Sequence, residues 1–235
     1  MKIDLHNFFK FYDEKNPKHV AAVEQFEVDL STKQPDLIED NSNWVRIYRT
    51  PNTPPKVEKV LNVPWYPQTD NYALPDSTCN SSACAMCLEF LKPGSLPAGP
   101  KGDDAYLRKV LAVGKSTDQS VQTQVLKGYG INSVFRTNLD FSDLDRELAA
   151  RRPSVLGILH RGPTHRPTRN SGHMICCIGK TDKGDYVFRD PYGSLHDGYS
   201  GPVINGREVV YSRMELEKRW TADGVKSGWG RIFLP

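Results

Sequence analysis

The stretch "DSTCNSSACAMCLEF", residues 76–90, holds three of the five cysteines of this 235-residue chain. Cys79 follows the turn-prone letters "LPDST" and comes where a predicted helix, residues 79–91, begins. The unpaired backbone N–H groups and the positive dipole end of that helix would lie beside its sulfur. Such a position lowers the pKa of a thiol and favours the nucleophilic thiolate. Cys79 is therefore a candidate nucleophile, and an inert, partly buried cysteine is the alternative.

The other four cysteines read as packing residues. Cys84 and Cys87 have the two-residue spacing of a zinc-ligand pair, and Cys176 and Cys177 lie downstream. Adjacent strand residues point to opposite faces, so Cys176 and Cys177 cannot easily enter one site. An odd number of cysteines in two clusters also reads poorly as a disulfide framework. We expect no metal and no other cofactor.

A catalytic thiol needs an imidazole base and a group that orients it. His173 opens a predicted strand after "NSG", and Asp190 ends the strand "YVFRD". A hairpin turning near residues 183–184 would bring these two side chains together. The alternative is a buried Asp190 paired with its neighbour Arg189. The remaining histidines fall in polar loops or near the N-terminus: His6, His19, His160, His165 and His196.

The tetrahedral intermediate of amide hydrolysis needs a hydrogen-bond donor for its oxyanion. Gln68 in "VPWYPQTDN" lies shortly before the helix that Cys79 begins. A single glutamine in a loop is by default a surface residue. Its place ahead of a cysteine-headed helix makes Gln68 the candidate oxyanion donor.

The elements that must position these residues follow an α+β order, with helices mostly before strands. Apolar spacing and caps predict three helices after the first, and alternation or short apolar runs predict strands. The helices are expected in residues 103–111, 117–130 and 140–152, and the strands in residues 131–138, 153–160, 173–180 and 185–191.

The chain is predicted to have one main domain and a small appendage. Residues 5–28 carry apolar side chains at helical spacing, interrupted by Pro17. A proline-rich stretch without periodicity follows and reads as a linker. We therefore expect a helical N-terminal appendage in residues 1–50, a linker in residues 51–57, and the main domain in residues 58–235.

Composition excludes some classes of function. The net charge of +3 is too small to indicate a nucleic-acid partner. No apolar run approaches the ~20 residues that would span a membrane. Acidic residues interrupt the start of the chain, where a signal peptide would need an apolar core. We expect synthesis in the cytoplasm, and the oligomeric state stays open.

As an ordered set, four segments resemble a family of papain-like cysteine peptidases, those related to the double-glycine-leader peptidases of bacteriocin export. They are "VPWYPQ", "TCNSSACAMCLEFL", "SGHMICCIGK" and "YVFRDPYG", and the likeness covers roughly residues 61–195. The resemblance implies a papain-like cysteine peptidase fold, with a Cys-headed helix packed on an antiparallel sheet. It makes Cys79 the nucleophile, His173 the base, Asp190 the orienting acid and Gln68 the oxyanion donor. The letters "CNSS" depart from the family's common Cys-Gly-Pro.

Two further segments are similar to parts of cell-wall-lysing proteins of tailed phages: residues 8–26 and residues 211–235. This likeness implies an endolysin that cleaves peptide bonds in bacterial peptidoglycan, with action at the cell wall. A processing peptidase for a protein substrate is the alternative among enzymes. A non-catalytic module that binds the wall or a peptide is the alternative from another class.

Overall fold

A computed structural model describes residues 57–234, and the side chains from residue 60 onward. The predicted helical appendage, residues 1–50, and all of the predicted linker except its last residue lie outside the described residues. Among residues 57–234, no helix is both long enough and apolar enough to cross a bilayer.

The centre of the described part is a sheet of seven strands in which every pairing is antiparallel. The strands run in the spatial order β2-β7-β3-β4-β5-β6, and β1 also pairs with β4. Their bounds are β1 Val57–Val60, β2 Ser133–Leu139, β3 Ser154–Leu159, β4 Gly172–Thr181, β5 Tyr186–Arg189, β6 Val209–Tyr211 and β7 Gly228–Phe233.

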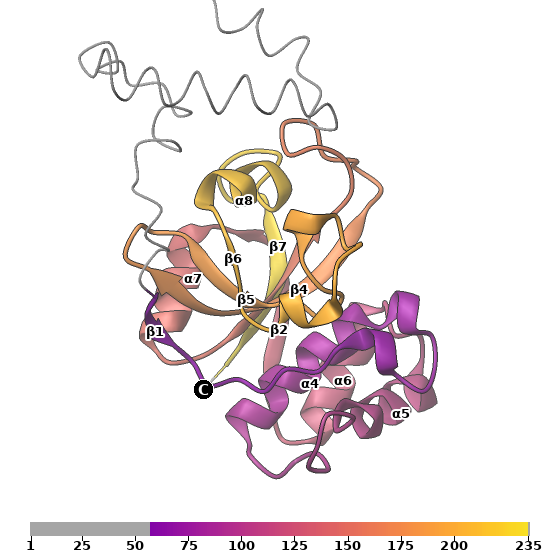
Figure 1. Ribbon diagram of the computed structural model, residues 1–235. Helices are drawn as coiled ribbons and strands as arrows, with labels where there is room; N and C mark the ends of the chain where they lie inside the picture. The colour runs from indigo at the N-terminus through magenta and orange to yellow at the C-terminus, as the bar shows by residue number, and fades with distance from the viewer. Residues whose placement is uncertain (1–56, 235) are drawn as a thin grey trace, which may run out of the picture. The chain divides into compact units, whose positions relative to one another are not determined.

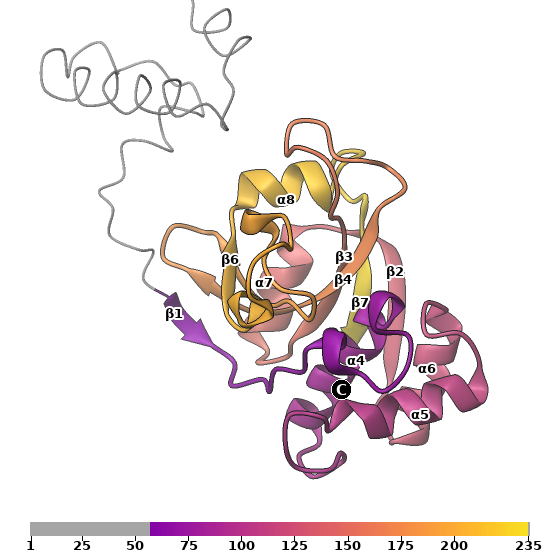
Figure 2. The same cartoon turned by 45° about the vertical axis from the view of Figure 1, so that its right-hand side comes forward.

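Helices cover both faces of this sheet. The helices are α4 Cys79–Leu91, α5 Asp103–Val113, α6 Gln119–Gly128, α7 Phe141–Ala149 and α8 Arg213–Arg219. The first three gather on one side of the sheet (Figures 1 and 2). Their side chains pack with strand residues such as Met174 and Cys176. The last two lie with the other face, in a second core that holds Ile175 and Cys177. The predicted α+β fold with a cysteine-headed helix on an antiparallel sheet is confirmed.

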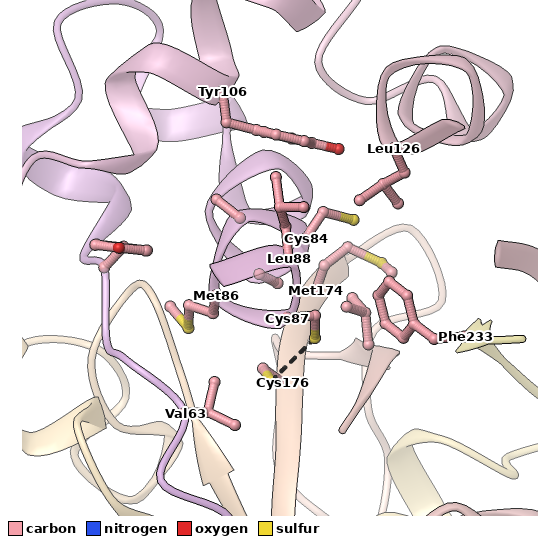
Figure 3. Close-up of a cluster of buried hydrophobic side chains, with 14 of the residues drawn as sticks. Val63, Cys84, Met86, Cys87, Leu88, Tyr106, Leu126, Met174, Cys176 and Phe233 are labelled. Atoms are coloured by element: carbon pink, nitrogen blue, oxygen red, sulfur yellow. Dashed lines mark hydrogen bonds between the residues drawn. The ribbon is translucent and has the colours of Figure 1, made fainter. Parts of the chain in front are cut away.

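The helix α4 is buried almost throughout, because small and apolar side chains occupy every face of its first three turns. Residues 80–88 are all buried, as expected of a helix at the centre of a domain. Figure 3 shows Cys84, Cys87 and neighbouring side chains of α4 among residues from the sheet and from α5 and α6. Cys87 Sγ lies 3.4 Å from Cys176 Sγ of β4. These cysteines pack as small hydrophobic side chains.

The predicted hairpin of β4 and β5 is present, with Cys177 opposite Phe188 and a bulge just after Cys177. Cys176 and Cys177 contribute to different cores, so adjacent residues of this strand do face opposite sides. The hairpin places the start of β4 and the residue after β5 at the same edge of the structure.

Strand β7 was not predicted, although it lies between β2 and β3. Its sequence "GWGRIF" carries two glycines, which weaken a strand signal. Both are needed for close packing, as Gly230 shows: a Cβ there would lie 2.5 Å from Val155 O. The ring of Trp229 in turn occupies the space that a side chain at Gly157 of β3 would fill. Strands β1 and β6 and helix α8 were also not predicted.

Candidate active site

The structure brings His173 and Asp190 into direct contact. His173 Nε2 donates to Asp190 Oδ1 over 2.7 Å. His173 is the second residue of β4 and Asp190 follows the last residue of β5, and both are buried. Asp190 fixes the ring orientation of His173 and leaves Nδ1 as the nitrogen that is available to another group.

Asp190 is itself held by donors on every side. Its Oδ1 also accepts the backbone N–H of Tyr192 at 3.0 Å. Its Oδ2 accepts the hydroxyls of Tyr211 at 2.8 Å and Tyr199 at 3.1 Å. An ionised carboxylate can only accept hydrogen bonds, and all four partners of this one are donors. The carboxylate is therefore held in a fixed orientation.

Arg189 is not the partner of Asp190. Its guanidinium donates to the backbone carbonyls of Val63, at 3.0 Å, and Arg207. It also pairs with the carboxylate of Glu208 at 3.1 Å. Arg189 thus binds other segments of the chain, and the alternative pair of Asp190 with Arg189 is not formed.

Cys79 is the first residue of α4 and remains partly exposed. Burial works against its thiolate, but the hydrogen bond and charge of His173 outweigh it, and the pKa of the Cys79 thiol is lowered. The backbone N–H groups of Met174 and Asn80 act in the same direction. Burial would likewise lower the pKa of His173, but Asp190 and Cys79 raise it to about 10. The two shifts together favour a thiolate–imidazolium pair.

Gln68 is buried and begins a short 3-10 turn, Gln68–Asp70, on the approach to α4. Its Nε2 donates to Pro75 O over 2.6 Å, and its backbone N–H donates to Pro191 O over 2.8 Å. The second of these bonds ties Gln68 to the segment that follows Asp190. A side-chain amide has two hydrogens, so one N–H of Gln68 stays available after the bond to Pro75.

A buried polar network, which sequence reasoning missed, holds the first turn of α4. Asn71 Nδ2 donates to Thr78 Oγ1 at 2.8 Å and to Ser82 Oγ at 3.0 Å. Ser82 Oγ donates in turn to Asp103 Oδ2 of α5 at 2.6 Å. Burial raises the pKa of the Asp103 carboxyl to about 7. This network fixes the loop from which Cys79 emerges.

Aromatic rings surround His173 and were also missed. Tyr199 presents an edge to the His173 ring at a centroid distance of 5.4 Å, and Tyr192 lies at 6.1 Å. The ring of His160, after β3, lies 5.5 Å from that of His173. His160 Nδ1 donates to Ser171 O at 2.7 Å, and burial lowers the pKa of the imidazole. Tyr192 and Tyr199 begin and end the stretch "YGSLHDGY", which directly follows Asp190 and Pro191. Their place just after Asp190 could have indicated that they lie near His173.

The remaining cysteines differ from Cys79 in their surroundings. Burial raises the pKa of Cys84 to about 11 and raises those of Cys87 and Cys177 further. Within residues 57–234, no three histidine, cysteine, aspartate or glutamate side chains are grouped so as to hold a metal ion. Cys84, Cys87, Cys176 and Cys177 are thus placed as packing residues.

A model of the Peptidase_C39 like family matches residues 60–227. The chain belongs to this family. The match covers the whole constellation of Cys79, His173, Asp190 and Gln68. It also extends past the likeness read from the sequence, to include β6 and α8.

Two solved structures were found to be similar to this Peptidase_C39 like chain, and the first of them supports the fold. A crystal structure assigned as a C39-like peptidase from Bacillus anthracis has a TM-score of 0.50 at 15% identity, covering 76% of this chain and 98% of that one. A double glycine motif protease from an AMS/PCAT transporter, in complex with the leader peptide, has a TM-score of 0.47 at 14% identity, covering 77% and 97%. No curated protein matches the chain.

Proposed function

We propose that this protein is a cysteine peptidase in which Cys79 is the nucleophile and His173 the general acid and base. One observation carries the proposal: His173 binds Asp190 through Nε2, and the same imidazole lowers the pKa of the Cys79 thiol. Packing or substrate binding alone would require neither the imidazole between a thiol and a carboxylate nor the lowered pKa of the thiol.

The first chemical step is attack of the Cys79 thiolate on the carbonyl carbon of a substrate amide. A C–S bond forms and the carbonyl π electrons move to oxygen. As the tetrahedral intermediate collapses, the C–N bond breaks and His173 transfers its Nδ1 proton to the leaving amine. A water molecule then attacks the thioester while His173 takes its proton, and the carboxylic acid leaves as the thiolate is restored.

The oxyanion of the intermediate is proposed to bind two donors, one from the turn Gln68–Asp70 and one from the start of α4. One is the second N–H of the Gln68 amide, and the other is a backbone N–H of the first turn. The bond to Pro75 O supports this role because it fixes the orientation of the Gln68 amide before substrate arrives. A preorganised donor of this kind lowers the barrier by about 3 kcal/mol.

We further propose that the substrate amide lies in the peptide part of bacterial peptidoglycan, as in a phage endolysin. The similarity of residues 8–26 and 211–235 to cell-wall-lysing proteins supports this target. A processing peptidase that acts on a protein uses the same chemistry, so the alternatives differ in substrate. A non-catalytic binding module differs from both in having no turnover.

The full chain and a Cys79→Ala variant should be compared on purified cell walls, by zymography and by mass spectrometry of the released fragments, and on unfolded protein substrates. We expect wall fragments with new amino and carboxyl ends from the wild type and none from the variant. Cleavage of protein alone would overturn the wall target in favour of a processing peptidase. Binding to walls without any cleavage by the wild type would overturn the enzymatic proposal.

A further inference from the structure

Asp190 Oδ2 faces away from His173 and accepts two phenol hydroxyls. Tyr211 lies on β6 and is fully buried, and its hydroxyl also accepts the backbone N–H of Leu195 at 3.0 Å. Its ring packs against Phe188 of the neighbouring strand, with centroids 5.4 Å apart. The Tyr211 hydroxyl is thus fixed by its strand, by packing and by a backbone donor, and its own hydrogen is directed at Asp190.

Tyr199 reaches the same oxygen from a different element. It follows the 3-10 turn Leu195–Asp197 and has a φ of 61°, an uncommon left-handed conformation for a residue with a side chain. Its backbone N–H is held by Ser194 O at 2.9 Å and by Asp197 Oδ1 at 3.0 Å. The chain therefore maintains a costly backbone geometry at the residue whose ring lies against His173 and whose hydroxyl binds Asp190.

We propose that Tyr199 and Tyr211 are positioning residues that act through Asp190 to orient His173 and to set its proton affinity. This inference rests on the proposed function, because it concerns the base of the same site. Both hydroxyls touch Asp190 Oδ2, whereas His173 touches Oδ1. The two hydroxyls would thus act on the imidazole through the carboxylate of Asp190.

The direction of the effect follows from the orientation of the hydroxyl dipoles. Each phenol points its positive hydrogen at the carboxylate, so it neutralises part of the charge that His173 experiences. Loss of one hydroxyl leaves the carboxylate more strongly negative toward the imidazolium, and the proton affinity of His173 rises. Burial raises the pKa of both tyrosines well above its ordinary value, so both remain donors at neutral pH.

Several titratable groups act on His173 at once and have to be separated from the tyrosines. Besides Tyr199 and Tyr211 themselves, they come from α4, from the residues after β5, and from the segment after β3: Cys79, Asp190, Tyr192 and His160. Tyr186 offers a matched control on the same sheet. It lies opposite Tyr211 in the pairing of β5 with β6 and is equally buried. Its hydroxyl donates to Asp145 at 2.8 Å rather than to Asp190.

The test is a titration of the full chain labelled with [15N]histidine, followed by NMR in the wild type and in Tyr199→Phe, Tyr211→Phe and Tyr186→Phe variants. The His173 signal is assigned by its loss in His173→Gln. We expect the apparent pKa of His173 to rise by about 0.5 unit or more in each variant that loses a hydroxyl to Asp190. It should not change in Tyr186→Phe.

The Tyr199→Phe and Tyr211→Phe variants should lower kcat about three- to tenfold at unchanged KM, because each keeps its ring and loses only a hydroxyl that is bonded to Asp190. An apparent pKa of His173 that is unchanged or lowered in Tyr199→Phe and Tyr211→Phe would overturn the proposal. If Tyr211→Phe does not fold, as judged by circular dichroism, Tyr199→Phe decides, because its ring is only partly buried. The titration needs no substrate, so a raised pKa in a protein that hydrolyses nothing would refute the proposed function and leave this inference standing.

Discussion

The first turn of α4 and the middle of the same helix place identical side chains in opposite electrostatic surroundings. Cys79, at the start, lies beside His173 and beside backbone N–H groups, and its pKa is lowered. Cys84 and Cys87, one and two turns later, are fully buried, and burial raises their pKa even though Arg231 acts in the opposite direction on Cys84. Burial raises the pKa of all three thiols, so the opposite shift of Cys79 comes from His173 and from the backbone N–H groups of Met174 and Asn80.

Two buried carboxyl groups differ in the number of donors that the fold supplies to them. Asp190 receives four hydrogen bonds, two of them on each oxygen. Asp103 receives one on its Oδ2, from Ser82, while its Oδ1 has no partner among residues 57–234. The pKa of Asp103 is accordingly raised to about 7 by burial. A carboxylate can serve as an anchor for a catalytic histidine only where the fold supplies such donors.

The largest effect is expected when the thiol of the first turn is removed. Cys79→Ala should abolish turnover, because no other side chain of the site can form the acyl-enzyme. Cys84→Ala is the matched control, since it removes the same atom one turn later and should retain activity. Steady-state kinetics on the substrate identified by the wall and protein assays would check both. Comparable losses of activity in the two variants would contradict the difference in reactivity between Cys79 and Cys84.

A smaller loss of activity is expected when the charge that supports the His173 imidazolium beside Cys79 is removed. Asp190→Asn keeps the shape of the side chain but cannot stabilise the His173 imidazolium. We expect kcat to fall by about 10³-fold, and the pKa of the Cys79 thiol to rise toward its ordinary value. The wild-type pH profile should be a bell, with an acid limb from formation of the thiolate and an alkaline limb near the raised pKa of His173. An unchanged rate with both limbs retained would remove Asp190 from the site.

Loss of the proposed oxyanion donor should separate catalysis from thiol reactivity. Gln68→Ala should lower kcat by about 10²-fold, because the oxyanion loses one fixed donor. The rate at which iodoacetamide alkylates Cys79 should change little, since alkylation passes through no oxyanion. A parallel fall in both rates would show instead that Gln68 maintains the position of Cys79.

The smallest effect on activity is expected in the sulfur pair of the core. Cys87 and Cys176 touch at 3.4 Å and are fully buried. Cys176→Ala should leave kcat/KM within about twofold while it lowers the free energy of unfolding by about 1–2 kcal/mol. Urea unfolding beside an activity assay measures both. Loss of activity in a stably folded variant would contradict a packing role for this pair.

Local signals explain which parts of the fold could be predicted from the sequence. The helix over residues 79–91 has the predicted bounds, because the turn letters before Cys79 and the small apolar residues after it are contiguous. The hairpin that carries His173 and Asp190 could be predicted because two apolar runs flank a glycine-containing turn. The position of the turn was enough to predict that His173 and Asp190 lie close together.

The parts that were missed depend on residues far apart in the chain. Strand β7 packs on β3 because Trp229 fills the space left by Gly157. The sequence of β7 alone does not indicate that it pairs with β3. Tyr199 and Tyr211 reach Asp190 from two separate elements beyond the hairpin. The bond of Gln68 to Pro75 O likewise depends on the path of a turn without periodicity. Such contacts are visible only once the tertiary structure is known.

The central claim is that Cys79 alone is an activated thiol, and selective alkylation tests it most directly. The folded protein is treated briefly with iodoacetamide at a series of pH values, and adducts are located by mass spectrometry. Because the pKa of Cys79 is lowered, its labelling should already be fast at pH values below the ~8.5 of an ordinary thiol, and should parallel the loss of activity. The other four cysteines should stay unlabelled. Labelling of Cys79 that begins only near the pKa of an ordinary thiol, or inactivation with Cys79 unmodified, would contradict the account.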